Sequence, residues 1–255
     1  MKLIVDIGNS NIVIGIQQNQ QWKHFWRINT QKKASEYHYS LKINNLLWEA
    51  SISPSDIDDF ILSTVVPELK TIFNNVLYKL NRQKVLVLDK SIYPKLNIKI
   101  PNPNEIGTDL VANALAVHNK YFQNNIIIDF GTALTFTIVN KKGEIIGVNI
   151  APGIKTAINA LSDKASQLEP VPLELPDNPI GYNTQTAIQN GVLIGYVGLV
   201  SHMIKVIQKN LGHNYTVIAT GGLSEILSKQ IPQIKIINKN LTLEGLALLP
   251  MFIND

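Results

Sequence analysis

Two short passages of the sequence place an aspartate and a glycine between apolar runs. The first is Asp6-Ile-Gly-Asn-Ser10 and the second is Asp129-Phe-Gly-Thr-Ala133. Glycine lets a turn bring successive backbone N–H groups close to a ligand, and N–H groups arranged in this way bind phosphate oxygens. An ordinary hairpin turn is the simpler reading of either passage alone. Two copies favour a pair of turns that hold one triphosphate.

The side chains of the first turn add to this chemistry. Asn9 and Ser10 supply donors, and Asp6 at the strand end is placed to hold a hydrated Mg²⁺. No G-x-x-x-x-G-K-[ST] sequence occurs in the chain. The predicted phosphate site is therefore not a Walker-type loop.

A third candidate is Asp109, which follows Gly107 and Thr108 at the start of an apolar-periodic stretch. The pattern predicts a helix that begins near Thr108 or Asp109. Acidic residues are common at helix starts, so a structural role is the better reading of Asp109 considered alone. A carboxylate there can also accept the proton of a substrate hydroxyl in phosphoryl transfer. Asp109 is therefore a candidate general base.

Gly221 and Gly222 follow the predicted strand 216–220 and precede a helix-like segment. In open α/β sheets the backbone approaches a bound nucleoside at this place. A glycine pair after a strand is more often plain turn chemistry. As the third element in order after two phosphate turns, the pair becomes a candidate for the adenosine side of a nucleotide site.

These residues need elements that position them, and the sequence predicts two similar sets. Each aspartate turn joins two apolar runs into a hairpin, a further β-like segment follows, and helix-like stretches then alternate with short apolar runs. Residues 187–207 read as one of these helices. The two aspartates lie 123 positions apart (129 minus 6), close to half the chain. We expect a duplicated α/β protein with halves at residues 1–118 and 119–255.

Composition excludes several other classes. Of 255 residues 45% are hydrophobic and 16% are charged, which is typical of a globular protein. The uncharged apolar runs fall short of the roughly 20 residues of a membrane span, and no signal peptide opens the chain. With Cys 0 there are no disulfides. The net charge of +4 is scattered, which argues against nucleic acid as a partner. We expect a cytoplasmic protein that binds no nucleic acid and no membrane.

Taken in order, the passages resemble the type III pantothenate kinases, members of the actin-like ATPase and sugar-kinase superfamily. The resemblance runs nearly end to end and rests on eight passages: 6–12, 63–67, 103–109, 128–133, 151–154, 183–191, 219–222 and 241–245. It implies a duplicated ribonuclease-H-like fold with two halves around a nucleotide cleft. It also implies phosphorylation of pantothenate by ATP in the first step of coenzyme A synthesis, Mg²⁺, a monovalent cation (K⁺ or NH₄⁺) and a homodimer.

The resemblance assigns roles position by position. The ATP contacts would be Asp6, Ile7, Gly8, Asn9, Ser10, Asn11, Ile12, Val13, Gly131, Thr132, Gly221 and Gly222. Asp109 would be the general base, and Asp129 would bind the monovalent cation. The pantothenate contacts would be Gly107, Thr108, Asp109, Leu110, Thr184 and Ile100.

Two of these positions depart from the family pattern. Relatives usually carry arginine where Leu110 stands, and many carry tyrosine where Ile100 stands. An arginine fork can grip the carboxylate of pantothenate, whereas leucine cannot. Two alternatives therefore stay open: a catalytically impaired nucleotide-binding paralogue with a regulatory role, and a kinase of a related small alcohol.

Overall fold

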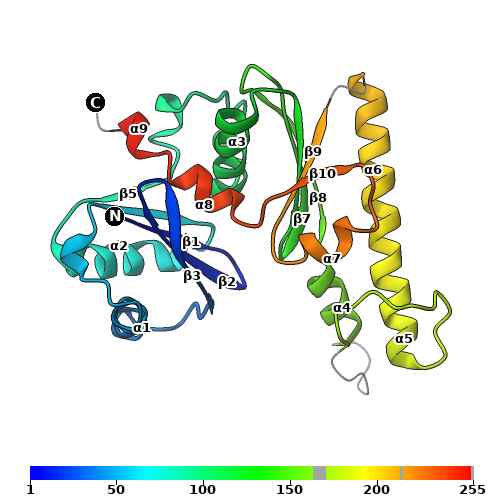
Figure 1. Ribbon diagram of the computed structural model, residues 1–255, viewed down its shortest axis with the longest axis horizontal. Coiled ribbons are helices and arrows are strands. Elements are labelled where there is room, and N and C mark those ends of the chain that lie inside the picture. The colour runs from blue at the N-terminus through cyan, green and yellow to red at the C-terminus, as the bar shows by residue number, and fades with distance from the viewer. Residues whose placement is uncertain (163–170, 213–214, 254–255) are drawn as a thin grey trace. The chain divides into compact units, whose positions relative to one another are not determined.

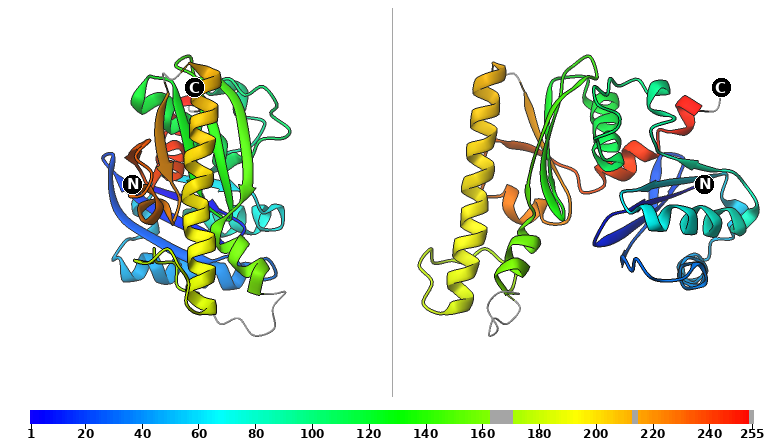
Figure 2. Two further views of the ribbon diagram at one scale, coloured as in Figure 1. Left: turned by 90° about the vertical axis from the view of Figure 1, so that its right-hand side faces the viewer. Right: turned by 180° about the vertical axis from the view of Figure 1, so that it is seen from behind.

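The computed structural model describes residues 1–162, 171–212 and 215–253. It divides the chain into two compact units, one of which is continuous in sequence. The first unit comprises Met1–Lys120 together with the segment that begins at Leu241, and the second comprises Tyr121–Asn240. Figures 1 and 2 show the elements of each unit, which are described separately below.

The first unit is built on a five-stranded mixed sheet. Its strands are β1 (Lys2–Ile7), β2 (Asn11–Gln18), β3 (Gln21–Asn29), β4 (Asp59–Thr64) and β5 (Val85–Val87), in the spatial order β3-β2-β1-β4-β5. Neighbours are antiparallel from β3 to β1 and parallel from β1 to β5. The predicted hairpin around the first aspartate turn is confirmed by the β1 and β2 pairing.

Helices cover both faces of this sheet. One face is covered by α1 (Glu36–Glu49) and α2 (Pro67–Asn81) (Figure 1). The buried side chains of Leu3, Val5 and Ile7 belong to the main core on this face. On the other face α8 (Leu241–Leu246) contacts β1 and β4. The remaining helical elements of the unit are η1 (Pro54–Asp56), η2 (Tyr93–Lys95), α3 (Thr108–Tyr121) and α9 (Pro250–Ile253).

The second unit repeats this topology. Its strands are β6 (Asn125–Phe130), β7 (Ala133–Val139), β8 (Ile145–Pro152), β9 (Thr216–Thr220) and β10 (Ile234–Ile237), in the order β10-β9-β6-β7-β8. The first three strands again pair antiparallel, and the last two pair parallel. Each strand has the same place in its sheet as its counterpart in the first unit. The predicted duplicated α/β fold is thereby confirmed.

The helices of the second unit are α4 (Ile154–Ser162), α5 (Thr184–Gln189), the π-helical turn η3 (Asn190–Ile194), α6 (Gly195–Leu211) and α7 (Ser224–Ser228). The elements α5, η3 and α6 follow one another without a break, and Figure 2 shows the resulting long helix lying along the second sheet. Val200, Ile204 and Ile207 of α6 are buried in the core of this unit.

This long helix corrects one expectation from the sequence. Thr184–Leu211 spans 28 residues with a window of mean hydropathy 1.4, so among the described residues one helix is long and apolar enough to cross a membrane. Polar residues divide this segment into apolar runs that are each shorter than a membrane span. These polar residues do not end the helix, so the helix is longer than any one run. Only 28% of that window is buried. One such helix is weak evidence of a membrane span, and this helix contributes side chains to a folded core.

The C-terminal segment corrects another expectation. Residues from Leu241 onward were expected in the second half, but they pack with the first unit. Leu241, Leu243 and Leu246 are buried there, and a Cβ on Gly245 would overlap with the carbonyl of Ala112 in α3. Glycine at this position therefore allows α8 and α3 to approach at backbone distance. Sequence periodicity carries no information about which sheet a terminal helix covers.

Candidate active site

The first aspartate turn is a tight connection whose ends are held by a neighbouring loop. The N–H of Gly8 donates to the carbonyl of Asn11 at 2.9 Å. Thr30, just after β3, donates through its hydroxyl to the Gly8 carbonyl at 2.7 Å and through its N–H to the Ser10 carbonyl at 3.1 Å. Asn9 and Ser10 are exposed at the tip. These contacts fix the turn in a conformation that leaves its tip accessible.

The side chains within the predicted ATP-binding stretch do not all face outward. Ile7 and Ile12 are fully buried in the core. At these two positions only the backbone is available to a ligand, whereas Asn9 and Ser10 can also offer side chains. The predicted set of ATP contacts thus divides into backbone and side-chain contributors.

Asp6 lies at the carboxyl end of the central strand, in register with Ser63 of the neighbouring β4. Residues 3, 5 and 7 point to the main core, so the alternation of a strand places Asp6 on the opposite face. Ser63 shares that face because paired residues of parallel strands project to the same side. This is also the face on which α8 contacts β1 and β4.

The start of α3 is fastened to this end of the sheet. Ser63 is fully buried, and its hydroxyl donates to Oγ1 of Thr108 at 3.0 Å. Oγ1 of Thr108 in turn donates to the carbonyl of Thr64 at 3.3 Å. The helix begins at Thr108 as predicted. Asp109 is therefore held beside the strand end that neighbours Asp6, and all of these residues belong to one unit.

The carboxyl of Asp109 occupies a confined place. Its Oδ1 accepts a hydrogen bond from the Leu110 N–H at 2.9 Å, and a Cβ on Gly107 would overlap with the same oxygen. Burial raises the pKa of Asp109 above its ordinary value, while hydrogen bonds from the backbone of Leu110 and of Asp109 itself lower it less. A raised pKa makes this carboxylate a stronger proton acceptor than an exposed one.

Tyr93 in η2 is a neighbour of Asp109 that the sequence analysis did not identify. Its side chain is buried, and burial together with the charges of Asp109 and Asp89 raises its pKa to about 12. The phenol therefore stays protonated at neutral pH. Ser63 was likewise assigned no role, although it opens the passage 63–67 that carries part of the family resemblance. The available signal for Ser63 was a hydroxyl near the end of a predicted strand, four positions before Pro67.

The two departures from the family pattern have different surroundings. Leu110 is 7% exposed and opens a run of eight buried residues, Leu110–Val117, in α3. Ile100 is half-buried in the loop that leads to α3. Leu110 thus contributes to the packing of the first unit. Its predicted contact with substrate stays a prediction, as does that of Ile100.

The second aspartate turn is built on the same plan. Asp129 at the end of β6 is in register with Thr220 of β9 and with Thr135 of β7. Gly131 and Thr132 are exposed, and the Thr132 carbonyl accepts from the Gly153 N–H at 3.0 Å and from the Thr156 hydroxyl at 2.7 Å. The turn is thus fixed by the start of α4, much as Thr30 fixes the first turn.

Gly221, the first residue of the glycine pair, lies directly against the second aspartate turn. Its φ is +88°, and a Cβ here would lie 2.5 Å from Oδ1 of Asp129 and 2.8 Å from backbone atoms of Phe130. A side chain would be both strained and obstructed, so glycine is required. The structure therefore brings Gly221 to Asp129 within the second unit. Gly222 follows it and is exposed.

Thr184 is exposed at the first position of α5, after the capping residue Asn183. It belongs to the second unit, whereas Gly107, Thr108 and Asp109 belong to the first. A shared contact of Thr184 and Asp109 with one substrate stays a prediction.

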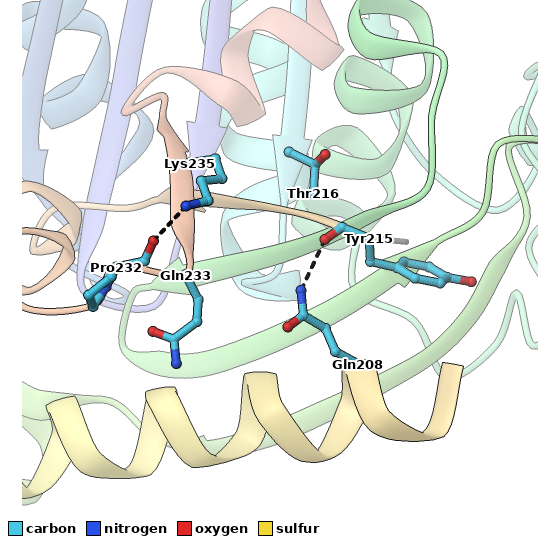
Figure 3. A pocket seen from close by; sticks show the side chains of 6 residues that line it. All are labelled: Gln208, Tyr215, Thr216, Pro232, Gln233 and Lys235. Carbon is cyan, nitrogen blue, oxygen red and sulfur yellow. Dashed lines mark hydrogen bonds between the residues drawn. The ribbon is translucent and has the colours of Figure 1, made fainter. Parts of the chain in front are cut away.

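A pocket of about 450 Å³ lies at the other end of the second sheet (Figure 3). It is lined by Gln208, Tyr215, Thr216, Pro232, Gln233 and Lys235. Gln208 donates to the Tyr215 carbonyl and Lys235 to the Pro232 carbonyl, so two of its polar groups are already paired. Thr216 begins β9, whereas Asp129 is in register with Thr220 at the end of β9. The pocket is therefore separate from the aspartate turns.

Comparison with known proteins identifies the family. The model of the family described as type III pantothenate kinase matches residues 2–206. A type III pantothenate kinase of Geotalea uraniireducens (strain Rf4) is 40% identical over 253 residues, which cover 98% of this chain and 97% of that protein. A type III pantothenate kinase of Brevibacillus brevis (strain 47) is 35% identical over 249 residues, with 98% of each chain covered.

Solved structures agree with the fold. One from Campylobacter jejuni, assigned by its name to the Baf family of transcriptional activators, has a TM-score of 0.57 at 20% identity and covers 98% of this chain and 97% of that one. At this identity the likeness shows the fold alone. The duplicated sheets, the length of the sequence matches and the family model together show that the chain belongs to the type III pantothenate kinase family.

Proposed function

We propose that this protein transfers the γ-phosphoryl group of ATP to the primary hydroxyl of pantothenate, the first step of coenzyme A synthesis. Membership of the type III pantothenate kinase family supports this activity. The structural observation that carries it is the placement of Asp109. Asp109, whose carboxyl has a raised pKa, lies in the first turn of α3, and Thr108 fastens the start of that helix to the strand end beside Asp6.

In this proposal Asp109 accepts the proton of the substrate hydroxyl as the oxygen attacks phosphorus. Phosphoryl transfer has a loose transition state, so catalysis depends mainly on positioning and on stabilising the charge of the phosphate oxygens. The N–H groups and side chains at the tip of the first turn, together with Thr132 and Gly131 of the second, bind the phosphates of one ATP molecule. Gly221 and Gly222 provide the adenosine side.

The residues fit a magnesium ion that arrives with the nucleotide. Among the described residues no group of three or more His, Cys, Asp or Glu side chains could form a metal cage. Mg²⁺ in kinases is held by one or two carboxylates, substrate phosphates and waters, so a cage is not required. Asp6 would hold this ion through water. When bound, Mg²⁺ neutralises charge on the transferring phosphate.

The surroundings of Asp129 fit a monovalent cation. Asp129 is in register with Thr135, whose hydroxyl oxygen is buried and has no hydrogen-bond partner among the described residues. An unpaired buried oxygen beside a carboxylate is a suitable ligand for K⁺ or NH₄⁺ because it gains a partner when the cation binds. We therefore place the monovalent cation at Asp129.

The identity of the alcohol is the least constrained part of the proposal. Gly107, Thr108, Asp109, Ile100 and Thr184 are the proposed pantothenate contacts. The buried Leu110 side chain cannot form hydrogen bonds to a carboxylate as an arginine guanidinium does. Another group must therefore bind the carboxylate of pantothenate. A kinase of a related small alcohol remains the second candidate because of this one substitution.

We also propose a homodimer in the cytoplasm, formed through the long helix of the second unit. Gly191, Gly195 and Gly198 have open space where a Cβ would stand, and Ile194 on the same side is 41% exposed. These positions share one helical face, and small residues allow a second helix to approach closely. Gly198→Arg should convert the dimer to monomer, as measured by light scattering after gel filtration. An unchanged mass would exclude this face as the dimer contact.

The activity is tested by ADP release from the purified protein with ATP, Mg²⁺ and K⁺, with and without pantothenate, alongside Asp109→Asn. General-base catalysis contributes about 10²–10⁴-fold, so the variant should lose turnover by that factor. ATP binding without turnover would favour a non-catalytic paralogue. Turnover with another alcohol in place of pantothenate would favour the changed specificity.

A further inference from the structure

We propose that Ser63 is a positioning residue: its buried hydrogen bond to Thr108 fixes the catalytic carboxyl of Asp109 relative to the first phosphate turn. This inference rests on the proposed role of Asp109. The end of β4 would then position the catalytic carboxyl, which is a role distinct from binding either substrate.

The geometry of the link supports a mechanical connection. Ser63 is fully buried and donates at 3.0 Å to Thr108, which donates at 3.3 Å to the Thr64 carbonyl. Two hydrogen bonds therefore join the first residue of α3 to two successive residues of β4. A buried hydroxyl that lost its partner would be costly, so this pairing resists displacement of the helix start.

The same strand end is also joined to the phosphate turn. Ser63 is the register partner of Asp6, and the N–H of Val65 donates to the Ile7 carbonyl at 3.0 Å. Asp109 directly follows Thr108, and Gly107 packs against its carboxyl oxygen. The chain of contacts from Asp6 through Ser63 to Thr108 is thus short and consists of backbone pairing plus one side-chain hydrogen bond.

Phosphoryl transfer is sensitive to this kind of connection. A misplacement of about 1 Å can cost about 10²-fold in rate, because reacting groups must be held within a narrow range of distance. Release of the helix start would move Asp109 with respect to the γ-phosphate while the turn at Gly8 kept its own hydrogen bonds. The effect should therefore fall on kcat and leave ATP binding intact.

The test compares two variants that break the Ser63–Thr108 hydrogen bond with the control variant Thr64→Val. Ser63→Ala removes the donor of this bond, and Thr108→Val removes its acceptor. The control removes a neighbouring hydroxyl whose hydrogen bonds, within the part of the chain that the structure describes, both join Val66, and it leaves the Thr64 carbonyl in place. Both link variants should lower kcat about 10-fold to 100-fold with KM for ATP within about twofold of wild type. Thr64→Val should keep kcat within about threefold. Equal kcat values for Ser63→Ala and Thr64→Val would overturn the inference.

A double-mutant cycle distinguishes positioning of Asp109 from any other effect. In the Asp109→Asn background, Ser63→Ala should cause no further loss of the residual turnover. A further loss of the same size would show that Ser63 acts by another route and would overturn the inference. Full activity of Asp109→Asn would instead defeat the proposed base, and the inference with it.

Hydrogen exchange tests the link without relying on turnover. Amides in the first turn of α3 should exchange faster in Ser63→Ala and Thr108→Val than in wild type. Their exchange rates should be unchanged in Thr64→Val. If the link variants lose protection there but the wild type phosphorylates no alcohol, the proposed function fails while the connection stands. Unchanged protection in the link variants would overturn the connection itself.

Discussion

The two units share one sheet topology but use the end of the fourth strand differently. In both, an aspartate at the end of the first strand is in register with a hydroxyl residue: Asp6 with Ser63, and Asp129 with Thr220. The residue that follows is Thr64, the last of β4, in one unit and Gly221, directly after β9, in the other. The first unit thereby fastens a helix that carries a candidate base, whereas the second lets its backbone approach the aspartate.

The duplicated sheet topology thus supports two local arrangements: one fastens a helix beside the aspartate, and the other brings backbone close to it. A Cβ at Gly221 would obstruct Asp129, whereas Thr64 accommodates a full side chain that bonds to Val66. The residue after the aspartate's register partner thus excludes a side chain in the second unit and carries one in the first.

The matched aspartates should differ in the ion they control. Asp6→Asn should lower kcat about 10²-fold and raise the Mg²⁺ concentration for half-maximal rate, because the carboxylate proposed to hold the hydrated metal is lost. Asp129→Asn should remove the stimulation by K⁺ and leave the Mg²⁺ requirement near that of wild type. Steady-state rates over titrations of both ions make this measurement. Identical ion responses of the two variants would contradict the division of roles.

The next prediction exchanges the residue types at the matched positions. Gly221→Thr should raise KM for ATP about 10-fold or more, because its φ of +88° and the 2.5 Å approach to Asp129 exclude a side chain. Thr64→Gly should lower stability by about 1 kcal/mol and leave KM for ATP within about twofold. ATP titrations and thermal melts measure both. Similar KM values in the two variants would remove the proposed asymmetry.

Stability should reveal that the C-terminal segment belongs to the first unit. Gly245→Ala should overpack the contact between α8 and Ala112 and cost about 2 kcal/mol, or roughly 6 °C in Tm. Gly147→Ala in β8 is the matched control, since its Cβ would meet no atom closer than 3.9 Å. Hydrogen exchange should show that the loss of protection in Gly245→Ala is confined to residues 1–120 and the segment after 240. Loss confined to residues 121–240 would contradict the division of the chain.

The smallest effect concerns the stability cost of the candidate base. Burial raises the pKa of Asp109, so the protonated form favours the folded state at low pH and this advantage is lost as pH rises through the folded pKa. At pH 7 the ionised carboxyl therefore costs stability, and Asp109→Asn should raise Tm on the order of 2 °C. The gain should vanish as the pH falls below the ordinary pKa of 3.8, where the carboxyl is protonated in both the folded and the unfolded state. A lower Tm for the variant at pH 7 would contradict this account.

Local patterns allowed much of the fold to be predicted. Apolar runs on both sides of the Asp6 and Asp129 turns predicted two hairpins, and the apolar-periodic stretch after Gly107 predicted a helix that starts near Thr108. These features depend on residues within a few positions of one another. The register of Asp6 with Ser63 depends on residues 57 positions apart (63 minus 6), and no local pattern encodes it.

The same limit explains the other misses. The long helix was predicted over residues 187–207, whereas its helical elements run without a break from Thr184, after the Asn183 cap, to Leu211, before the left-handed Gly212. Tyr93 gained its place beside Asp109 only through the folding of the loop before α3. Of the candidate site, the types and order of residues were predictable, whereas their distances were not.

The return of the chain to its first unit after residue 240 has a consequence for biosynthesis. The second unit is an uninterrupted insert that can fold as soon as it has left the ribosome. The first unit must wait for the last helices before its sheet is covered on both faces. A premature stop after Asn240 would therefore leave a folded insert attached to an incomplete partner with exposed apolar surface, which is a substrate for proteases and chaperones.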